Sequence, residues 1–331
     1  MSLKLSLIRT KETFPCANLA LEKFLTFCPQ KEEVILFLWQ NKKTVVIGRN
    51  QNAWKECNVE KLRADEGTLV RRLSGGGAVF HDLGNLNFSF LARREDYDVS
   101  RQLDVILEAV RMLGIDAGKS GRNDLTVRGQ KFSGNAFYES GDHACHHGTL
   151  MVDVDKELLG RYLNVSEDKL KSKAVSSVRS RVVNLKTLNE SVTIDKLAET
   201  MAAAFGKVYR ETVNLFEKER LDAEQISSDT AFFASWDWTF GRRIPFTHRM
   251  GKRFDWGDAV LELRVEEGII RQAVCWSDAM DQEQILRIGS ALEGCRYREN
   301  DIEKALCSVT ETEPLQEKMR ADILNLIRSE I

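Results

Sequence analysis

The stretch Arg71-Arg-Leu-Ser-Gly-Gly-Gly-Ala-Val-Phe-His-Asp-Leu-Gly-Asn85 places three consecutive glycines in an apolar, strand-like context. Each glycine costs about 0.5–1 kcal/mol relative to alanine inside regular structure, so together they forgo roughly 2–3 kcal/mol. A backbone with positive φ, or one that lies against a ligand with its N–H groups facing an anion, offsets such a loss. Arg71 and Arg72 bring two positive charges to the mouth of the loop, which favours a ligand over the alternative of a solvated glycine-rich hairpin.

Length and composition exclude several classes of protein. The chain has 331 residues, of which 43% are hydrophobic, enough to bury the cores of a large and a small domain. Lys and Arg total 48 against 50 Asp and Glu, a net charge of −2, so no global basic field indicates nucleic-acid binding. No apolar stretch reaches the roughly 18 residues of a membrane span, and we expect a cytoplasmic protein without a membrane partner.

Seven scattered cysteines form no Cys-x-x-Cys pair, so we expect reduced thiols. The segment from His143 to His147 raises the alternative of a metal centre, because imidazole and thiolate are good zinc ligands. Adjacent ligands on one short stretch rarely complete a tetrahedron without a group from elsewhere. We therefore favour a hydrogen-bonded polar turn there.

Hydrophobic patterns predict a mixed α/β sheet domain flanked by helices. Residues 33–39 and 44–48 read as a buried β-hairpin. Short strands are expected at 86–91 and 149–154, and helices at 17–27, 100–114 and 193–205, with a serine able to cap the second helix.

The pattern changes after the aromatic and basic segment 235–245, which predicts a boundary between domains at 1–246 and 247–331. Downstream, residues 259–266 and 269–276 read as two strands joined by a turn at Glu267 and Gly268. Helices are expected around 282–292, 301–307 and 315–327. The second domain is thus expected to be a small α+β unit of ordinary size.

A second polar segment follows at 120–136. Asn123 and Asp124 can terminate a strand or a turn. Residues 125–127 then read as a strand, a tight turn covers 128–130, and Lys131 starts the returning strand, so that Asp124 and Lys131 lie opposite or nearly so. Small residues including Ser133 and Gly134 follow, leaving room for backbone approach while the ammonium supplies a charge for carboxylate or phosphate oxygens. One such charge pair at 4 Å is worth ~4 kcal/mol at a dielectric near 20. The alternative is a solvated charge at a strand edge.

Two further segments carry polar groups. His147, in a predicted polar turn that enters an apolar strand, either orients a carbonyl or caps the turn. The run from Lys173 to Asn184 alternates basic and small polar residues without acidic ones. It suits either an exposed loop that closes over an anion or a solvated basic strand.

Taken together, these segments resemble the lipoate-protein ligase family of the biotin/lipoate ligase superfamily, over nearly the whole chain. The motifs that carry the resemblance are Arg-Arg-x-Ser-Gly-Gly-Gly-Ala-Val-Phe-His-Asp at 71–82, Gly-Arg-Asn-Asp-Leu at 121–125, Lys131 with Ser-Gly-x-Ala, His-His-Gly-Thr-Leu at 146–150, and Ser-Val-Arg-Ser-Arg-Val at 177–182. Trp39, Trp54 and the segment 235–241 add to it.

The resemblance implies a two-step acyl transfer. Lipoate and ATP give lipoyl-AMP and pyrophosphate, and the lipoyl group then passes to a lysine on lipoyl domains of 2-oxoacid dehydrogenase E2 subunits or on the glycine cleavage H protein. ATP, Mg²⁺ and lipoate are implied as substrates or activator, with no permanently bound cofactor.

The same resemblance assigns roles to residues. Lys131 bridges the carboxylate and phosphate oxygens as the catalytic group, Arg72 contacts the nucleotide phosphates, and Asp124 is a magnesium ligand. Substrate or nucleotide contacts are implied at Arg72, Ser74, Gly75, Gly76, Gly77, Ala78, Val79, Phe80, His81, Asn123, Asp124, Lys131, Ser133, Gly134 and His147.

Two other functions stay open. An octanoyltransferase carries its acyl group on a cysteine and needs no ATP. Cys145 is the cysteine nearest the motifs, and we expect it to be structural. A binding protein that retains the pocket to dock acyl carriers without chemistry is the other alternative, which the intact Arg72, Asp124 and Lys131 disfavour.

Overall fold

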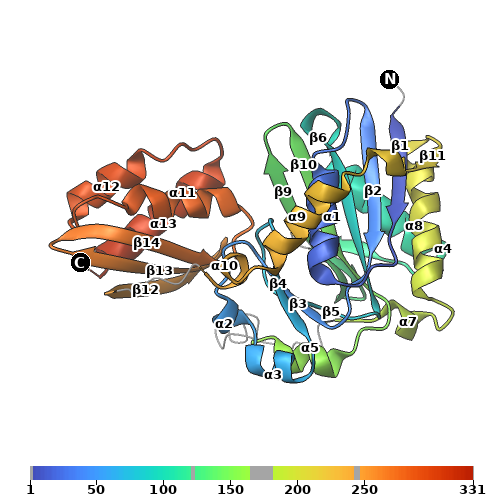
Figure 1. Ribbon diagram of the computed structural model, residues 1–331, viewed down its shortest axis with the longest axis horizontal. Coiled ribbons are helices and arrows are strands. Elements are labelled where there is room, and N and C mark those ends of the chain that lie inside the picture. The colour runs from blue at the N-terminus through green and yellow to red at the C-terminus, as the bar shows by residue number, and fades with distance from the viewer. Residues whose placement is uncertain (1–2, 121–123, 165–181, 242–246, 331) are drawn as a thin grey trace. The chain divides into compact units, whose positions relative to one another are not determined.

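The computed structural model describes residues 3–120, 124–164, 182–241 and 247–330 (Figure 1). The chain forms two compact units. The first unit contains Met1–Val46, Cys57–Val70 and Val79–Ser235, and the second contains Ile47–Glu56, Arg71–Ala78 and Trp236–Ile331.

The first unit is built on an eight-stranded mixed sheet, which confirms the predicted fold class. β1 pairs in parallel with β2 and β11, and the remaining pairs are antiparallel. The order across the sheet is β11 (Val213–Leu215), β1 (Lys4–Arg9), β2 (Glu33–Trp39), β6 (Asn85–Arg93), β10 (His143–Met151), β9 (Gln130–Ser140), β8 (Asp124–Val127) and β7 (Gly118–Ser120).

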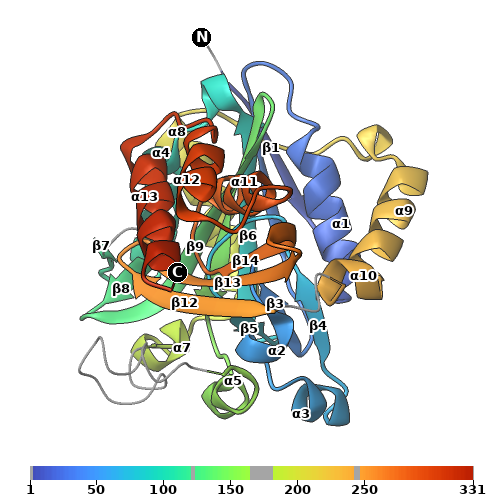
Figure 2. The same ribbon diagram turned by 90° about the vertical axis from the view of Figure 1, so that its left-hand side faces the viewer.

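Helices cover both faces of this sheet. Val34, Leu36 and Leu38 of β2 belong to the apolar core that α4 (Val99–Met112) and α8 (Ile194–Tyr209) share. The alternate residues of β2 are also buried but point to the other face. There α1 (Pro15–Thr26) packs on the sheet and against α9 (Ala223–Ala234) (Figure 2).

The three predicted helices of this unit are confirmed as α1, α4 and α8. The N-cap of α4 is Asp98, whose side chain accepts from the Arg101 N–H, and not the serine we expected. Short helices connect the larger elements. They are α2 (Ala53–Glu56), α3 (Val59–Ala64), η1 (Arg94–Asp96), α5 (Lys156–Tyr162), α7 (Leu185–Leu188), η3 (Lys218–Arg220) and α10 (Trp236–Thr239).

The predicted hairpin of residues 33–39 and 44–48 is wrong, although both strands exist. Both edges of β2 are occupied, by β1 on one side and β6 on the other. β3 (Thr44–Ile47) instead lies between β4 (Thr68–Arg71) and β5 (Val79–His81) in a separate three-stranded sheet. Alternation alone could not reveal this, because it does not say which strands pair.

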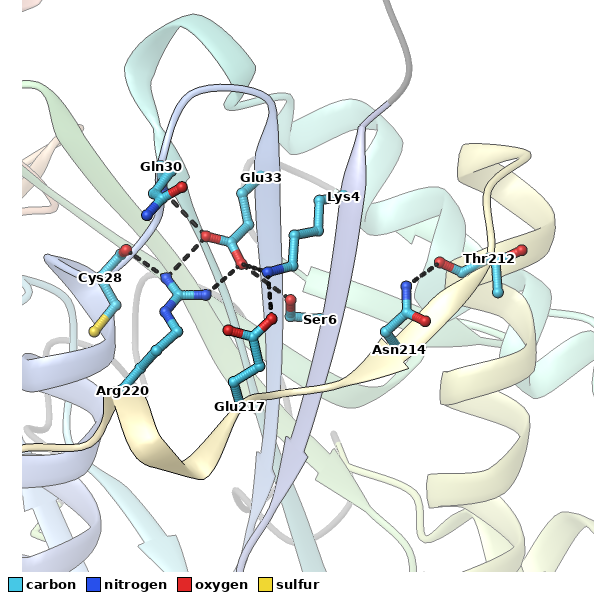
Figure 3. A network of polar contacts seen from close by, with 9 residues as sticks. All are labelled: Lys4, Ser6, Cys28, Gln30, Glu33, Thr212, Asn214, Glu217 and Arg220. Carbon is cyan, nitrogen blue, oxygen red and sulfur yellow. Dashed lines mark hydrogen bonds and ion pairs between the residues drawn. The ribbon is translucent and has the colours of Figure 1, made fainter.

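A buried ion pair holds the start of β2 in the large sheet (Figure 3). The guanidinium of Arg220 in η3 donates to both carboxylate oxygens of Glu33, at 2.7 and 3.0 Å. Ser6 and the Gln30 N–H donate to the same carboxylate. Burial alone raises the pKa of Glu33, but these hydrogen bonds and the Arg220 charge outweigh it and lower the pKa below its usual value.

The second unit contains an antiparallel sheet in the order β12 (His248–Phe254), β13 (Gly257–Glu266) and β14 (Ile269–Ser277). α11 (Gln282–Leu292), α12 (Glu299–Cys307) and α13 (Pro314–Arg328) pack on it around a core that includes Leu261, Leu263 and Ile285. The predicted strands and helices are confirmed here, and β12 was missed.

The predicted domain boundary at residue 246 lies outside the described residues, so it stays a prediction. The second unit also contains two segments from the N-terminal third of the chain, 47–56 and 71–78. Within the described ranges, no helix combines the length and apolarity needed to cross a bilayer.

Candidate active site

The three glycines lie in the loop that connects β4 to β5, within the second unit. Gly76 takes φ 85° and its N–H donates to the Ala279 carbonyl at 3.1 Å. A Cβ on Gly75 would lie 2.4 Å from the Ala279 oxygen and 2.6 Å from the Met280 oxygen, whereas one on Gly77 would meet nothing within 4 Å. Positive φ therefore explains Gly76, close approach to the chain's own backbone explains Gly75, and Gly77 faces open space.

Arg72 holds this loop in shape. Its guanidinium is buried and donates to the carbonyl oxygens of Gly75, at 2.6 Å, and Gly77, at 2.9 Å, and to the Ser74 hydroxyl at 2.9 Å. The Ser74 carbonyl in turn accepts from the Arg49 N–H. The described contacts thus give Arg72 a role in positioning the loop, and its contact with phosphates stays a prediction.

Arg71 does not bring its charge to the mouth of the loop, so this expectation was wrong. Its side chain is 1% exposed. The guanidinium donates to five backbone carbonyls, those of Gly48, Arg49, Gln51, Trp238 and Thr239. Such a fully hydrogen-bonded buried guanidinium joins segments of the chain and is not a ligand group.

β5 follows the loop and belongs to the first unit. Phe80 is buried against Tyr162, with ring centroids 5.5 Å apart. His81 is also buried, with Nδ1 3.3 Å from the Asn41 amide nitrogen and its ring edge-on to Trp39. Ala78 and Val79, between Gly77 and this buried pair, are partly exposed.

Lys131 and Asp124 meet across the β8–β9 hairpin, as predicted. The ammonium lies 2.7 Å from Asp124 Oδ1, and both side chains are partly exposed, at 38% and 42%. A Cβ on Gly134, which pairs with Asp124 in the register, would lie 2.7 Å from the Lys131 Nζ. The absence of a side chain at 134 therefore creates the space that the lysine occupies. Asn123 lies outside the described residues.

The same strand carries an unsatisfied polar group. The Ser133 hydroxyl is fully buried and has no hydrogen-bond partner among the described residues. Buried hydroxyls are normally paired, so such a group is a candidate for ligand contact. The backbone of Lys131 is also fixed, since its carbonyl accepts from the Val183 N–H. Residues 173–181 of the predicted basic run, which covers 173–184, lie outside the described residues.

His147 lies within strand β10 and not in a polar turn, which corrects our expectation. Its Nδ1 lies 2.8 Å from Glu22 Oε1 of α1, and both side chains are less than 10% exposed. The Ser89 hydroxyl donates to the same carboxylate oxygen and accepts from the Trp39 indole N–H. This buried polar network comes from one helix and three neighbouring strands.

Glu22 and Ser89 were missed by the sequence reasoning. A signal for Glu22 was present, because it follows Leu19 by three residues and precedes Leu25 by three on the apolar face of a predicted helix. An acidic residue on such a face needs a buried partner. For Ser89, in a strand that is buried over nearly its whole length, only the pairing of β6 with β10, where it lies opposite His147, shows the partner.

Strand geometry also separates the suspected metal ligands. Cys145 and His147 share one face with Glu22, their ligand atoms all within 4.8 Å, while His146 points to the other face toward Gln102 and Asn135. Burial lowers the pKa of His146 to about 3 and raises that of the Cys145 thiol well above its usual value. A thiol so protonated is a poor nucleophile, which supports a structural Cys145.

The predicted site residues are divided between the units. Arg72 to Ala78 belong to the second unit, and the described others belong to the first. Each group has the chemistry expected of an anion and acyl site. The first unit offers a half-exposed ammonium, a carboxylate and a hydroxyl that has no partner among the described residues. The second unit offers a glycine loop with one open position.

Two family models match the sequence. The model described as the lipoyl protein ligase A/B catalytic domain matches residues 15–206, and the one described as the bacterial lipoate protein ligase C-terminus matches residues 243–327. Together they span six of the eight strands of the large sheet, all but β1 and β11, and the C-terminal sheet with its helices.

Similar proteins are found along nearly the whole chain. The chain is 41% identical over 320 residues to lipoate-protein ligase A of Psychrobacter cryohalolentis, covering 94% of each protein. The crystal structure of LipL1 of P. falciparum in complex with lipoate matches with a TM-score of 0.83 and 29% identity, covering 97% of this chain and 99% of that one.

A third match is the bi-partite lipoate protein ligase of Thermoplasma acidophilum, described with its E2 lipoyl domain. It has a TM-score of 0.62 and 25% identity, covering 75% of this chain and 100% of that chain. The motifs, the mixed sheet with its C-terminal unit and these likenesses agree, and the chain belongs to the lipoate-protein ligase family.

Proposed function

We propose that this chain is an ATP-dependent lipoate-protein ligase. It activates lipoate as lipoyl-AMP and transfers the lipoyl group to the ε-amine of a lysine on lipoyl domains of 2-oxoacid dehydrogenase E2 subunits or on the glycine cleavage H protein. The observation that carries the proposal is the partly exposed Lys131 ammonium, paired with Asp124 and given its space by Gly134. A pair so exposed adds at most about 1 kcal/mol to stability, so folding does not require it.

In the first step a carboxylate oxygen of lipoate attacks the α-phosphorus of ATP. The new O–P bond forms as the bond to pyrophosphate breaks, and negative charge gathers on the oxygens around phosphorus. Lys131 is the group proposed to face these oxygens, because an ammonium there stabilises the developing charge. Mg²⁺ travels with the phosphates of ATP, and the Asp124 carboxylate, half exposed beside Lys131, offers the hard oxygen ligand that this ion prefers.

In the second step the acceptor lysine attacks the acyl carbonyl carbon. The amide bond forms, the bond to AMP breaks, and the amine loses a proton. In the first unit, the partly exposed Val79 and the Ser133 hydroxyl, which has no partner among the described residues, are the groups we propose to contact the acyl-adenylate. The open position at Gly77 and the neighbouring Ala78, in the second unit, stay predicted contacts. Arg72 supports this indirectly, since it fixes the loop carbonyls. His147, held by Glu22, is proposed to line the acyl side of the site.

Lys131→Ala tests the proposal, with Lys119→Ala as the matched control. Lys119 sits on β7, the edge strand of the same sheet, and likewise pairs with an aspartate, Asp104 at 2.9 Å, with similar exposure. We expect lipoate-dependent pyrophosphate release to fall about 10²–10³-fold in Lys131→Ala, the usual effect of removing one stabilising donor. It should be unchanged in Lys119→Ala. Unchanged release in Lys131→Ala would refute the assignment.

A transferase that needs no ATP is disfavoured by the thiols. Cys145 is buried and its pKa is raised, so it is a poor acyl carrier. A docking protein without chemistry predicts binding of lipoate without any pyrophosphate release. The same assay therefore separates both alternatives from the ligase.

A further inference from the structure

The β12–β14 sheet of the second unit has one face packed by helices and one that is not. Leu261 and Cys275 point into the helical core. Their strand neighbours Glu262 and Trp276, and Arg249 on β12, therefore point to the opposite face. Glu262 and Trp276 are nonetheless buried.

A pocket of about 450 Å³ lies over this face, within the second unit. Its floor includes Arg249, Glu262 and Trp276, and its walls include Trp54 of α2 and Phe240 after α10. The volume suits one or two side chains of a partner and lies in the range of ordinary ligand pockets.

Exposed aromatic rings border the pocket. Trp54 and Trp236 are 47% and 55% exposed. Phe240 packs against both, with ring centroids 5.0 and 4.3 Å away. We call Trp54, Trp236 and Phe240 the tryptophan patch. Large exposed rings beside a pocket are typical of interface hot spots, where Trp and Arg are enriched.

Of the two charged groups that pair in the pocket, the positive one, Arg249, is the one exposed to solvent. The Glu262 carboxylate is 8% exposed, accepts from the Trp276 indole at 2.7 Å and pairs with Arg249 at 3.3 Å. The Arg249 side chain is 53% exposed. An occupant therefore meets apolar rings and a solvent-facing guanidinium, which matches an apolar side chain flanked by a carboxylate.

Hydrogen bonds of Arg71 connect the tryptophan patch to the start of the glycine loop. Arg71 donates to the carbonyls of Gly48, Arg49 and Gln51, which precede α2, and to those of Trp238 and Thr239 in α10. The Trp238 indole donates back to the Arg71 carbonyl at 2.8 Å. Arg72, the next residue, holds the loop carbonyls. Both sides of the tryptophan patch are thus anchored where the loop begins.

We propose that the tryptophan patch and its pocket dock the protein that accepts the acyl group, through an acidic, apolar surface segment of that acceptor domain. The inference rests on the proposed function, in which the glycine loop borders the acyl-adenylate and the acceptor must approach it. Lipoate and ATP are small and need no such surface. An acceptor domain needs one that lies beside the loop and contributes affinity.

The test compares Trp54→Ala/Trp236→Ala with the wild type in the two half reactions. Phe27→Ala is the control, because Phe27 is similarly exposed, at 44%, in the first unit. Pyrophosphate release with lipoate and ATP alone should be unchanged in both variants, which also shows that they fold. The KM for an apo lipoyl domain should rise at least tenfold in the double variant only. Arg249→Glu should raise it as well, and more steeply at low salt.

An unchanged KM in the double variant would overturn the proposal. A second result would also overturn it: the wild type sediments as a dimer, the double variant sediments as a monomer, and the two have the same KM. The occupant of the patch would then be a second copy of this chain. If the wild type releases no pyrophosphate, the proposed function fails by itself. Direct titration of the apo lipoyl domain then decides the docking question, and equal affinity in both proteins contradicts it.

Discussion

Gly75→Ala should destabilise the second unit through a backbone clash. The added methyl would lie 2.4 and 2.6 Å from the carbonyl oxygens of Ala279 and Met280. The backbone must therefore shift until both distances exceed 3.0 Å. Both neighbours are backbone atoms in the connection between β14 and α11, so no side chain can turn away. Overpacking of this kind costs about 1–3 kcal/mol. At 2–4 °C per kcal/mol, Tm should fall by about 2–12 °C.

Gly77→Ala is the matched control, two residues away in the same loop. A methyl there meets nothing within 4 Å, and the φ of Gly77 is not positive. Stability should be unchanged or rise by up to about 1 kcal/mol, because alanine restricts the unfolded chain. Scanning calorimetry of the two variants checks this. Equal Tm values for Gly75→Ala and the wild type, or a larger loss in Gly77→Ala, would refute the reasoning.

Three further predictions concern buried groups. The folded-state pKa of Glu33 is lowered, so its contribution to stability is present above its unfolded pKa near 4.5 and is lost as pH falls through the folded value. Glu33→Gln should cost about 3 kcal/mol at pH 7 and flatten the acid limb of the stability curve in urea unfolding, and an unaltered acid limb would contradict this. Burial lowers the pKa of His146 to about 3, so its Cε1 proton resonance should not shift between pH 7.5 and 5; a midpoint near 6.5 would mean that the ring is solvated. A thiol reagent at pH 8 should label the exposed Cys307 in the folded protein and reach the buried Cys145 only after unfolding, and Cys145→Ala should retain activity. Complete loss of activity in Cys145→Ala would give that thiol a chemical role.

Local patterns predicted most elements of the fold. α4, α8, β13 and β14 follow from apolar periodicity and turn residues, and the structure has them close to the expected positions. Strand pairing was harder, because periodicity identifies a strand but not its neighbours. For this reason β2 and β3 were joined into a hairpin that does not form. β12 was missed because its exposed positions and glycine weaken any alternation.

In the candidate site, too, local contacts could be predicted from the sequence and distant ones could not. The Lys131–Asp124 pair was predictable, since a tight turn brings the residues near its two ends close together, although a register shift sets Lys131 opposite Thr126 and Asp124 opposite Gly134. The distant partners of Arg71 and Gly75 were not, because Trp238 and Ala279 come about 165 and 200 positions later in the chain. Tertiary contacts of this range leave no trace in local spacing. Glu22 is an intermediate case. Its place on an apolar helix face predicts that it is buried, but it does not predict that His147 is its partner.

The central claim is tested most directly by the mass of an apo lipoyl domain after incubation with this protein, lipoate and ATP. We expect a mass increase equal to one lipoyl group in amide linkage, present with ATP and absent when ATP is omitted. Lys131→Ala should give none in the same time, and Lys119→Ala should match the wild type. A mass increase that does not need ATP, or no increase with all components present, would contradict the account.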